Sequence, residues 1–389
     1  MSLSEKIGNF IRFNVAKRKL DSRNIDISEG NPLEQWGLMK IRSEVNSHDE
    51  LKRQLPGKEL DRNDIVEYKL FKLRELIDYV SRNSPFYQEL YEKEGISSAD
   101  IKTIDDLDRI PLTEQEELAK NPYHFLCVSR KDIAREFTTS GTTTTDEQDM
   151  KKRVSYTQQE LLEIVDSVIS GLKMAGMDSE EDVLQIMYPT ITATWDPGLV
   201  LSKACDLAGF KSVINSSTSI EDQINTMKKS RTTFIIGTSS FLYNLSKSIT
   251  DANQAKELGI KNIICSSEPL TEPMKEQIES VWGCKAVRQW GMTELGLANA
   301  IECEEQNGMH VNNPDFLVEV IDPESGKVLP PGKEGELVFT TLRRKCMPLI
   351  RYRTKDLAIL IDKPCKCGTK VDQRIKNVRR IGFDESNNK

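Results

Sequence analysis

Short β-rich runs alternate with segments of helical length and period between residues 137 and 300, and this alternation limits the folds available to the chain. The expected strands are 183–187, 212–215, 233–236, 260–265 and 286–290. The expected helices between them are 158–174, 199–208, 220–229, 240–248 and 272–281. Such alternation predicts a layered, mostly parallel α/β sheet. Ligands of these sheets bind where strands end in loops, at the carboxyl edge.

The segments on either side of this core do not alternate between strands and helices. Residues 1–23 predict a basic amphipathic helix, which we expect to dock on the protein rather than on a membrane. A helical pattern over 61–94 is interrupted at Pro85. Beyond 305, strands and turns predict an antiparallel unit with a hairpin turn at 322–326. We therefore divide the chain into a helical segment 1–125, a core 126–305, a β-rich unit 306–375 and a tail 376–389.

Composition excludes several classes of protein. The 54 Lys and Arg residues against 61 Asp and Glu give a net charge of −7, which argues against a general nucleic-acid binder. No apolar stretch approaches the roughly 20 residues of a membrane span. The N-terminus lacks a secretory pattern, so we expect a cytoplasmic protein with reduced cysteines.

A hydroxyl-rich loop at 138–145 precedes one of the expected helices. Backbone N–H groups and hydroxyls in such a loop can donate to polyphosphate, and following lysines could neutralise its charge. The candidate residues are Ser140, Gly141, Thr142, Thr143, Lys151 and Lys152. A polar loop without a ligand is the alternative, and the spacing of a Walker loop is absent.

Two further loops carry residues suited to a nucleotide. One follows an expected buried strand and reads Gln289, Trp290, Gly291, Met292, Thr293 and Glu294. Its indole could stack on a purine, Thr293 could donate to a phosphate, and Glu294 could hold Mg²⁺. The other loop, 351–356, ends in Asp356, which could accept two ribose hydroxyls.

These three loops, in this order, resemble the adenylate-forming superfamily of acyl-CoA synthetases, peptide-synthetase adenylation domains and luciferases. The likeness is nearest to the phenylacetate–CoA ligase branch and runs from about residue 83 to about Arg380. Supporting stretches are 237–242, 267–270, 335–338 and 347–354. The resemblance implies the large N-terminal domain of these enzymes, with layered α/β sheets and a β-barrel-like unit.

The same resemblance implies a role for each position. Ser140 to Thr143 would hold the β- and γ-phosphates of ATP. Glu268, Pro269, Gln289 and Trp290 would line the adenine. Thr293 would contact the α-phosphate, Glu294 would bind Mg²⁺ and Asp356 would bind the ribose. The implied reaction is attack of a carboxylate on the α-phosphorus, which gives acyl-AMP and pyrophosphate; the thiol of CoA or of a carrier protein then displaces AMP.

The sequence departs from the family at two places. Residues 144–147 stand where relatives have a glycine and then a proline–lysine pair, so Lys151 or Lys152 would have to replace that lysine. Relatives also carry a small C-terminal domain whose lysine bridges the carboxylate and the α-phosphate. The segment 374–380 resembles the hinge to that domain. We therefore expect no complete C-terminal lid, and a separate subunit could supply it.

A family-like architecture would place the acid between the 188–195 loop and the 237–241 turn. Tyr188 and Trp195 could form the walls of a pocket for an aromatic acid, with Gly237 and Thr238 opposite. The alternative is that these aromatic residues belong to the core.

Four further residues have the chemistry of a metal site. Cys303 and His310 bracket a turn, and Cys365 and Cys367 follow some way along the chain. Three thiolates and one imidazole would complete a closed tetrahedral zinc site, a pattern also present in some relatives. The alternative is a surface turn with reduced thiols.

The leading interpretation is therefore an ATP-dependent ligase that activates a carboxylic acid, with an aromatic acid favoured, for transfer to CoA or a carrier protein. One alternative is adenylyl transfer to a phenolic hydroxyl of a coenzyme. Another is a non-catalytic nucleotide-binding relative. The sequence is also compatible with a homodimer.

Overall fold

The computed structural model describes residues 31–55, 59–139, 151–188, 197–249, 252–312, 314–369 and 373–382. Within them, five strands form a parallel arrangement in the order β4, β3, β5, β6, β7. Their bounds are β3 Val183–Met187, β4 Lys211–Ile214, β5 Phe234–Thr238, β6 Asn262–Ser266 and β7 Lys285–Met292. The α/β core expected from the sequence is confirmed.

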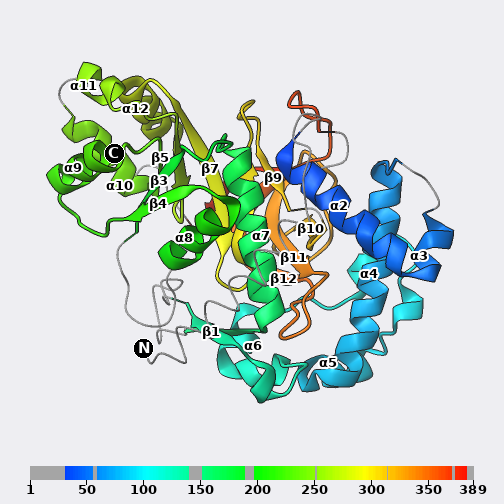
Figure 1. The fold of residues 1–389 in the computed structure, drawn as a ribbon. Helices are drawn as coiled ribbons and strands as arrows, with labels where there is room; N and C mark the ends of the chain where they lie inside the picture. The colour runs from blue at the N-terminus through cyan, green and yellow to red at the C-terminus, as the bar shows by residue number, and fades with distance from the viewer. Residues whose placement is uncertain are drawn as a thin grey trace.

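The chain reverses after β7, and the sheet continues with antiparallel strands. These are β8 Gly296–Glu302, β9 Met309–Val311, β10 Phe316–Ile321, β11 Glu334–Thr341, β12 Tyr352–Ile361 and β13 Arg374–Arg380. The complete order is β10-β11-β12-β13-β9-β8-β7-β6-β5-β3-β4 (Figure 1). The expected β-rich unit is therefore the antiparallel half of one sheet.

Two domain boundaries drawn from the sequence do not interrupt this sheet. β8 and β9, on either side of residue 305, are hydrogen-bonded to each other. The stretch expected to be a hinge is β13, which pairs with both β12 and β9. Local composition did not reveal this continuity because strand pairing is settled by tertiary contacts.

Helices cover both faces of the parallel half. The side chains of Phe234 and Ile236 point to one face, where α7 Gln158–Met174 and α8 Pro197–Ala208 pack. Ile235, between them, points to the other face, as alternation along a strand requires. The helices on that face are α9 Ile220–Ser230, α10 Ser239–Ser248, α11 Ala252–Glu257 and α12 Glu272–Trp282.

The local sequence explains where these helices begin. In α7 the side chain of Thr157 accepts from the N–H of Glu160, and the Glu160 carboxylate accepts from the N–H of Thr157. Strand β3 and helix α7 match their expected bounds, and the other expected elements of the core agree to within two residues. Clear periodicity bounded by capping residues is what makes such elements predictable.

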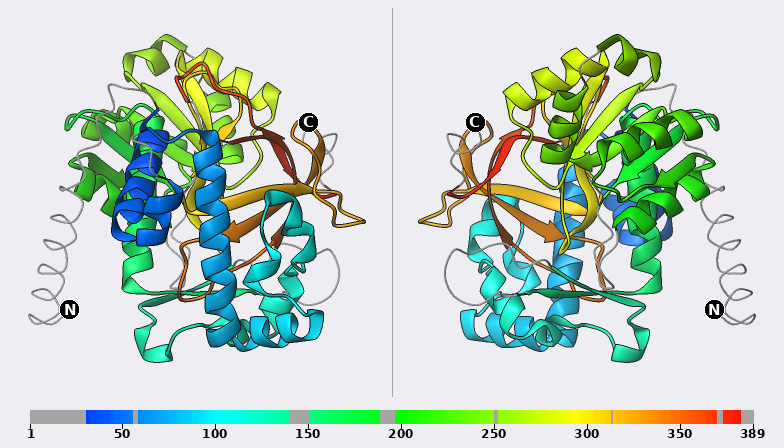
Figure 2. Two further views of the ribbon diagram at one scale, coloured as in Figure 1. Left: turned by 90° about the vertical axis from the view of Figure 1, so that its right-hand side faces the viewer. Right: turned by 90° about the vertical axis from the view of Figure 1, so that its left-hand side faces the viewer.

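The first described part of the chain is helical, as expected. Its helices are α2 Pro32–Ser47, α3 Asp49–Gln54, α4 Arg62–Asn83, α5 Pro85–Glu94 and α6 Gln115–Lys120, with 3-10 turns at Ser98–Asp100, Ile104–Arg109, Pro122–Phe125 and Arg130–Asp132. Helix α4 ends just before Pro85, as the proline predicts. In the left view of Figure 2, α4 runs vertically across the face of the molecule that is turned toward the viewer. The amphipathic helix expected at 1–23 lies outside the described residues.

Backbone bonds attach this helical segment to the sheet. The N–H of Thr113 donates to the carbonyl of Arg351 (2.9 Å), and the N–H of Arg353 donates to the carbonyl of Thr113 (3.1 Å). A two-stranded ribbon of β1 Arg135–Thr138 and β2 Arg153–Tyr156 lies between the helical segment and α7. No described helix is both long enough and apolar enough to cross a membrane.

The buried Arg351–Glu319 pair fastens the same region. Both residues are 2% exposed, Arg351 Nη2 lies 2.9 Å from Glu319 Oε1, and Nη1 donates to the carbonyl of Ile110 (2.7 Å). We predict that Arg351→Met lowers the free energy of unfolding by about 3–5 kcal/mol, because it leaves a buried carboxylate without its partner. Denaturant unfolding measures this.

The exposed Arg109, whose side chain pairs with Asp106 at 3.4 Å, provides the control. Arg109→Met should cost less than about 1 kcal/mol. If Arg351→Met and Arg109→Met lower the free energy of unfolding equally, the stabilising role assigned to the buried pair is contradicted.

Candidate functional site

The carboxyl ends of four parallel strands meet at one edge of the sheet and assemble the site. Tyr188 follows β3, Thr238 ends β5, Ser266 ends β6 and Trp290 lies near the end of β7. Thr238 and Ser266 are direct neighbours in the register. The edge predicted to bind a ligand is therefore the edge on which the candidate residues gather.

Trp290 and Asp356, predicted from separate loops, are in contact. The indole Nε1 donates to Asp356 Oδ2 (3.0 Å), and the ring stacks on Phe339 with centroids 5.1 Å apart. Arg380 of β13 forms an ion pair with Asp356 Oδ1 at 2.9 Å. Burial raises the pKa of Asp356, while Arg380 and the indole N–H act in the opposite direction because they stabilise the carboxylate.

Gln289, Glu268 and Pro269 lie at the same edge. The hydroxyl of Ser266 donates to the side-chain oxygen of Gln289. Glu268 is exposed, and its carboxylate accepts from the N–H of Ser240 (2.9 Å) at the first turn of α10. The predicted adenine-lining residues are thus close to the strand ends.

Glu294 is held from two sides. It is 2% exposed, and its Oε1 lies 2.7 Å from Lys152 Nζ and accepts from the hydroxyl of Tyr352 (3.1 Å). Lys152 Nζ also donates to Gln115 Oε1 (2.6 Å). The structure therefore pairs two predicted site residues with each other, whereas the neighbouring Lys151 is exposed.

The backbone around Thr293 and Glu294 is fixed by groups from other elements. The hydroxyl of Tyr156 donates to the carbonyl of Thr293 (2.6 Å), and Arg344 Nη1 donates to the carbonyl of Glu294 (2.9 Å). Gly296 has a φ of +91°, and a Cβ there would lie 3.0 Å from Arg344 Nη2. This corner therefore requires glycine. Gly291 and Met292 precede it within β7.

The described residues that flank the hydroxyl-rich loop are Thr139 and Lys152, and Lys152 is the partner of Glu294. The N–H of Thr139 donates to the carbonyl of Lys152 (2.9 Å), and the N–H of Lys152 donates to Thr139 Oγ1 (3.0 Å). The candidates Ser140, Gly141, Thr142 and Thr143 between these ends lie outside the described residues. Their predicted contact with phosphate stays a prediction.

Part of the expected acid pocket is described. Tyr188 is buried, and burial raises its pKa to about 12, with hydrogen bonds to Ser266 and Ser267 acting in the opposite direction. Gly237 is buried at the end of β5, and a Cβ there would meet Leu242 and Met187 at 3.4 Å. Trp195 lies outside the described residues, so the aromatic walls of the pocket stay a prediction.

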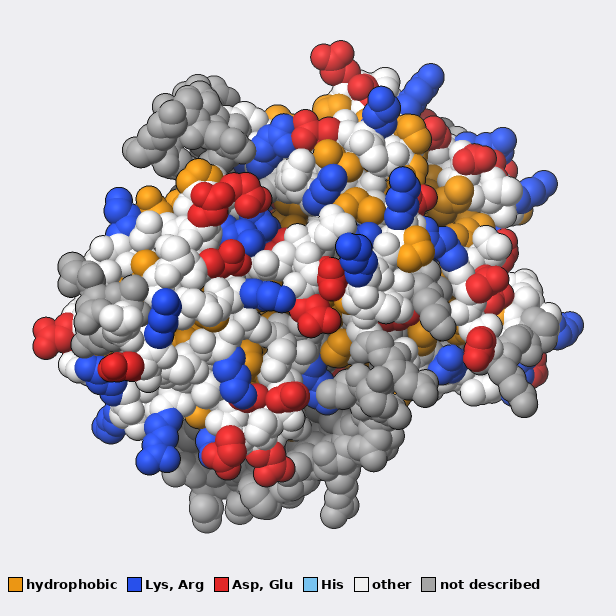
Figure 3. Space-filling model, turned by 90° about the horizontal axis from the view of Figure 1, so that it is seen from above, with side chains coloured by type: hydrophobic (Ala, Val, Ile, Leu, Met, Phe, Trp, Pro, Cys, Tyr) orange, Lys and Arg blue, Asp and Glu red, His pale blue; other side chains and the backbone are white. Residues whose placement is uncertain are grey.

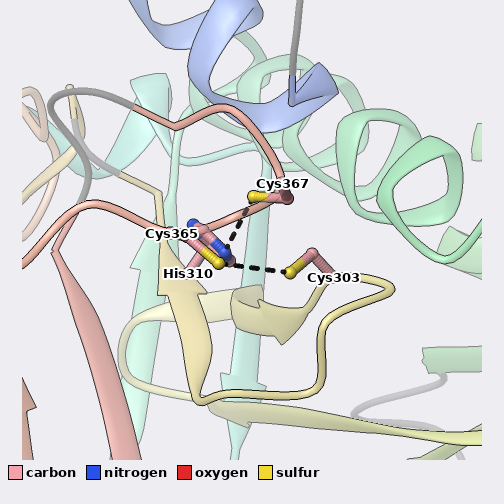
Figure 4. A group of neighbouring side chains, drawn as sticks. All are labelled: Cys303, His310, Cys365 and Cys367. Carbon is pink, nitrogen blue, oxygen red and sulfur yellow. Dashed lines mark hydrogen bonds between the residues drawn. The ribbon is translucent and has the colours of Figure 1, made fainter.

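Cys303, His310, Cys365 and Cys367 come together as the sequence predicts (Figure 4). One candidate ligand atom from each lies within 4.8 Å of every other. The Sγ atoms of Cys303 and Cys365 are 3.7 Å apart, and Cys367 Sγ is 3.6 Å from His310 Nε2. Hydrogen bonding from Cys303 lowers the pKa of Cys367, with support from His310. These donors match the ligand set of a closed tetrahedral site.

Charged side chains of both signs are mixed on one face of the protein. On the face seen from above, acidic and basic side chains lie next to one another rather than in fields of one sign (Figure 3).

Sequence reasoning missed several residues that shape the site. Gln115, Tyr156 and Arg344 each contact a predicted residue but were not singled out. No local pattern marks them, because the sequence around a polar residue gives no sign of which distant carbonyl or ammonium its side chain will contact. Arg380 was noted only as part of a hinge-like stretch.

Known proteins resemble this chain in both sequence and structure. The family of AMP-binding enzymes matches residues 77–342. A phenylacetate-coenzyme A ligase of Thermus thermophilus is 31% identical over 303 residues, covering 76% of this chain and 66% of the relative. Another phenylacetate-coenzyme A ligase, from Escherichia coli K12, is 26% identical, and the match covers 78% of this chain and 68% of that relative. The chain thus spans about two thirds of the length of these curated relatives.

A solved structure resembles the fold. The open conformation of 2-hydroxyisobutyryl-CoA ligase aligns with a TM-score of 0.72 at 19% identity and covers 81% of this chain and 74% of the other. At this identity the likeness concerns the fold, which agrees with the fold class expected from the sequence.

The Arg380–Asp356 pair generates a pH prediction. Because the guanidinium favours the charged carboxylate, Arg380→Met should raise the pKa of Asp356 further above its ordinary value. Carboxyl ¹³C NMR across a pH series measures the midpoint, with Asp356→Asn to assign the signal. Arg379→Met is the control, since Arg379 pairs with Glu334 instead (2.6 Å). A midpoint that stays or falls in Arg380→Met would contradict the assignment.

Proposed function

Because the chain belongs to the AMP-binding enzyme family, we propose that it activates a carboxylic acid with ATP. A carboxylate oxygen attacks the α-phosphorus, the bond to pyrophosphate breaks, and acyl-AMP forms. The observation that carries this proposal is the contact between Trp290 and Asp356 beside the Thr293–Glu294 corner. This arrangement brings the indole of Trp290, the carboxylate of Asp356 and the hydroxyl-bearing Thr293 to one edge of the sheet.

The chain's own residues would bind and orient the nucleotide. Asp356 would accept the ribose hydroxyls, and Arg380 would stabilise the charged form of this carboxylate. The hydroxyl of Thr293 would donate to the α-phosphate, its main chain held in place by Tyr156. An in-line attack needs positioning and charge stabilisation rather than a protein nucleophile.

A magnesium ion on Glu294 does not fit the described geometry. The carboxylate is buried, and its Oε1 already contacts the Lys152 ammonium and accepts from the Tyr352 hydroxyl, whereas Mg²⁺ requires a near-octahedral set of oxygen ligands. No step is therefore derived through a metal ion at this residue. Mg²⁺ accompanying the phosphates of ATP remains an expectation from the family.

The relatives named phenylacetate-coenzyme A ligase favour an aromatic acid and CoA as the thiol acceptor. Transfer to a carrier-protein thiol is an equivalent second step. The cytoplasmic location, the homodimer and a separate subunit that completes the enzyme stay predictions from the sequence.

ATP–pyrophosphate exchange tests the proposal directly. We expect exchange with benzoate, phenylacetate or a hydroxylated benzoate, and little with short aliphatic acids. Exchange with aliphatic acids alone would contradict the aromatic pocket. No exchange with any acid would contradict acid activation.

Asp356→Ala links that activity to the site. Losing the acceptor for two ribose hydroxyls should weaken AMP binding and slow exchange by about tenfold to a hundredfold. Asp362→Ala, one residue beyond β12, is the matched control. Equal activity in the two variants would contradict the assigned ribose contact.

We also propose that the Cys303, His310, Cys365 and Cys367 cluster holds a structural zinc ion. Four ligands within reach of one centre leave no open position, so the metal would brace the fold rather than take part in chemistry. It would join the β8–β9 turn to the segment that precedes β13.

Metal analysis tests the zinc proposal. We expect about one zinc per purified chain, and loss of zinc with a lower melting temperature in Cys367→Ser. Cys284→Ser, a half-buried cysteine outside the cluster, should leave both unchanged. If the wild-type protein freed of zinc melts at the same temperature as the protein that contains zinc, a structural metal is contradicted.

A further inference from the structure

The ion pair between Lys152 and Glu294 is almost completely closed to solvent. The two side chains are 5% and 3% exposed, and their charged atoms lie 2.7 Å apart. Burying either charge without the other would be unfavourable, because an unpaired charge loses its hydration. The pair therefore behaves as one unit.

Lys152 is held in position by two other elements. Its main chain is hydrogen-bonded to Thr139 in both directions. Its ammonium donates to Gln115 of α6, whose amide in turn donates to the carbonyls of Arg353 (3.1 Å) and Thr354 (2.8 Å). Lys152 cannot leave Glu294 without disrupting this chain of contacts.

Glu294 is equally constrained. Tyr352, which is fully buried, donates to the same carboxylate oxygen that faces Lys152, and Arg344 holds the carbonyl of Glu294. A second acidic residue of the site, Asp356, has its own cationic partner in Arg380. Among the described residues, the carboxylates of Glu294 and Asp356 are thus each paired with a cation of the protein.

We infer that Lys152 is the resident counter-cation of Glu294 and that this carboxylate binds no divalent metal ion. Lys152 acts as a positioning residue: it neutralises Glu294 and, through Gln115 of α6, links the chain just before β2 to β12. The inference deepens the proposed nucleotide site, but the pair itself can be tested without nucleotide or substrate.

Manganese binding to the zinc-loaded chain without nucleotide is the first test, with Mn²⁺ as the probe and electron paramagnetic resonance as the readout. Wild type and Glu294→Gln should bind Mn²⁺ equally weakly. Lys152→Met, which frees the carboxylate, should bind one Mn²⁺ at least about tenfold more tightly. Adding Glu294→Gln to Lys152→Met should abolish that gain.

Two results would overturn the inference. One is a manganese site in wild type that disappears in Glu294→Gln. The other is a folded Lys152→Met variant that binds Mn²⁺ no better than wild type. Lys151→Met is the matched control, because it removes the same charge from the exposed neighbouring residue.

Thermal denaturation provides a second, ligand-free test. Lys152→Met and Glu294→Gln should each lower the melting temperature. The double variant should lose less than the two single decreases added together, because it removes both charges and leaves neither unpaired. If Lys152→Met melts like Lys151→Met, or if the two losses are additive, the inference fails. Failure of acid activation would leave both tests unchanged, so the two proposals are distinguished.

Discussion

The contacts of β12 with β7 and with the turn after β7 hold the two halves of the sheet together at the site. Tyr352, at the start of β12, donates to Glu294, and Asp356, further along, accepts from Trp290. The parallel half supplies the strand ends, but the antiparallel half supplies the partners that orient them. A nucleotide site built this way depends on the whole sheet rather than on one α/β unit.

The main elements of the fold were predictable because their signals are local. Strand β3 and helix α7 follow from periodicity and capping, which depend on neighbouring residues. The continuity of the sheet through β8, β9 and β13 was not predictable in this way, since pairing joins segments distant in sequence. Arg374–Arg380 therefore looked like a hinge but forms a strand.

The residues of the candidate site also fall into two groups, those that the local sequence identified and those that depend on contacts between distant segments. Trp290, Glu294 and Asp356 belong to an ordered series of loops, so the sequence identified them and the structure places them near one another. The zinc candidates were found from the ligand chemistry of cysteine and histidine on either side of a turn and from a pattern present in some relatives. By contrast, the partner of Glu294 depends on where β2 lies relative to β7, which no local pattern encodes.

The hydrogen bonds between Thr139 and Lys152 have a consequence for the length of chain that can separate them. These two residues, on either side of residues 140–151, are bonded to each other twice. When both ends of a loop are fixed, the entropy of closing it grows only with the logarithm of its length. Lengthening the chain between these two anchored residues is therefore inexpensive for folding as long as the contact between Thr139 and Lys152 is kept.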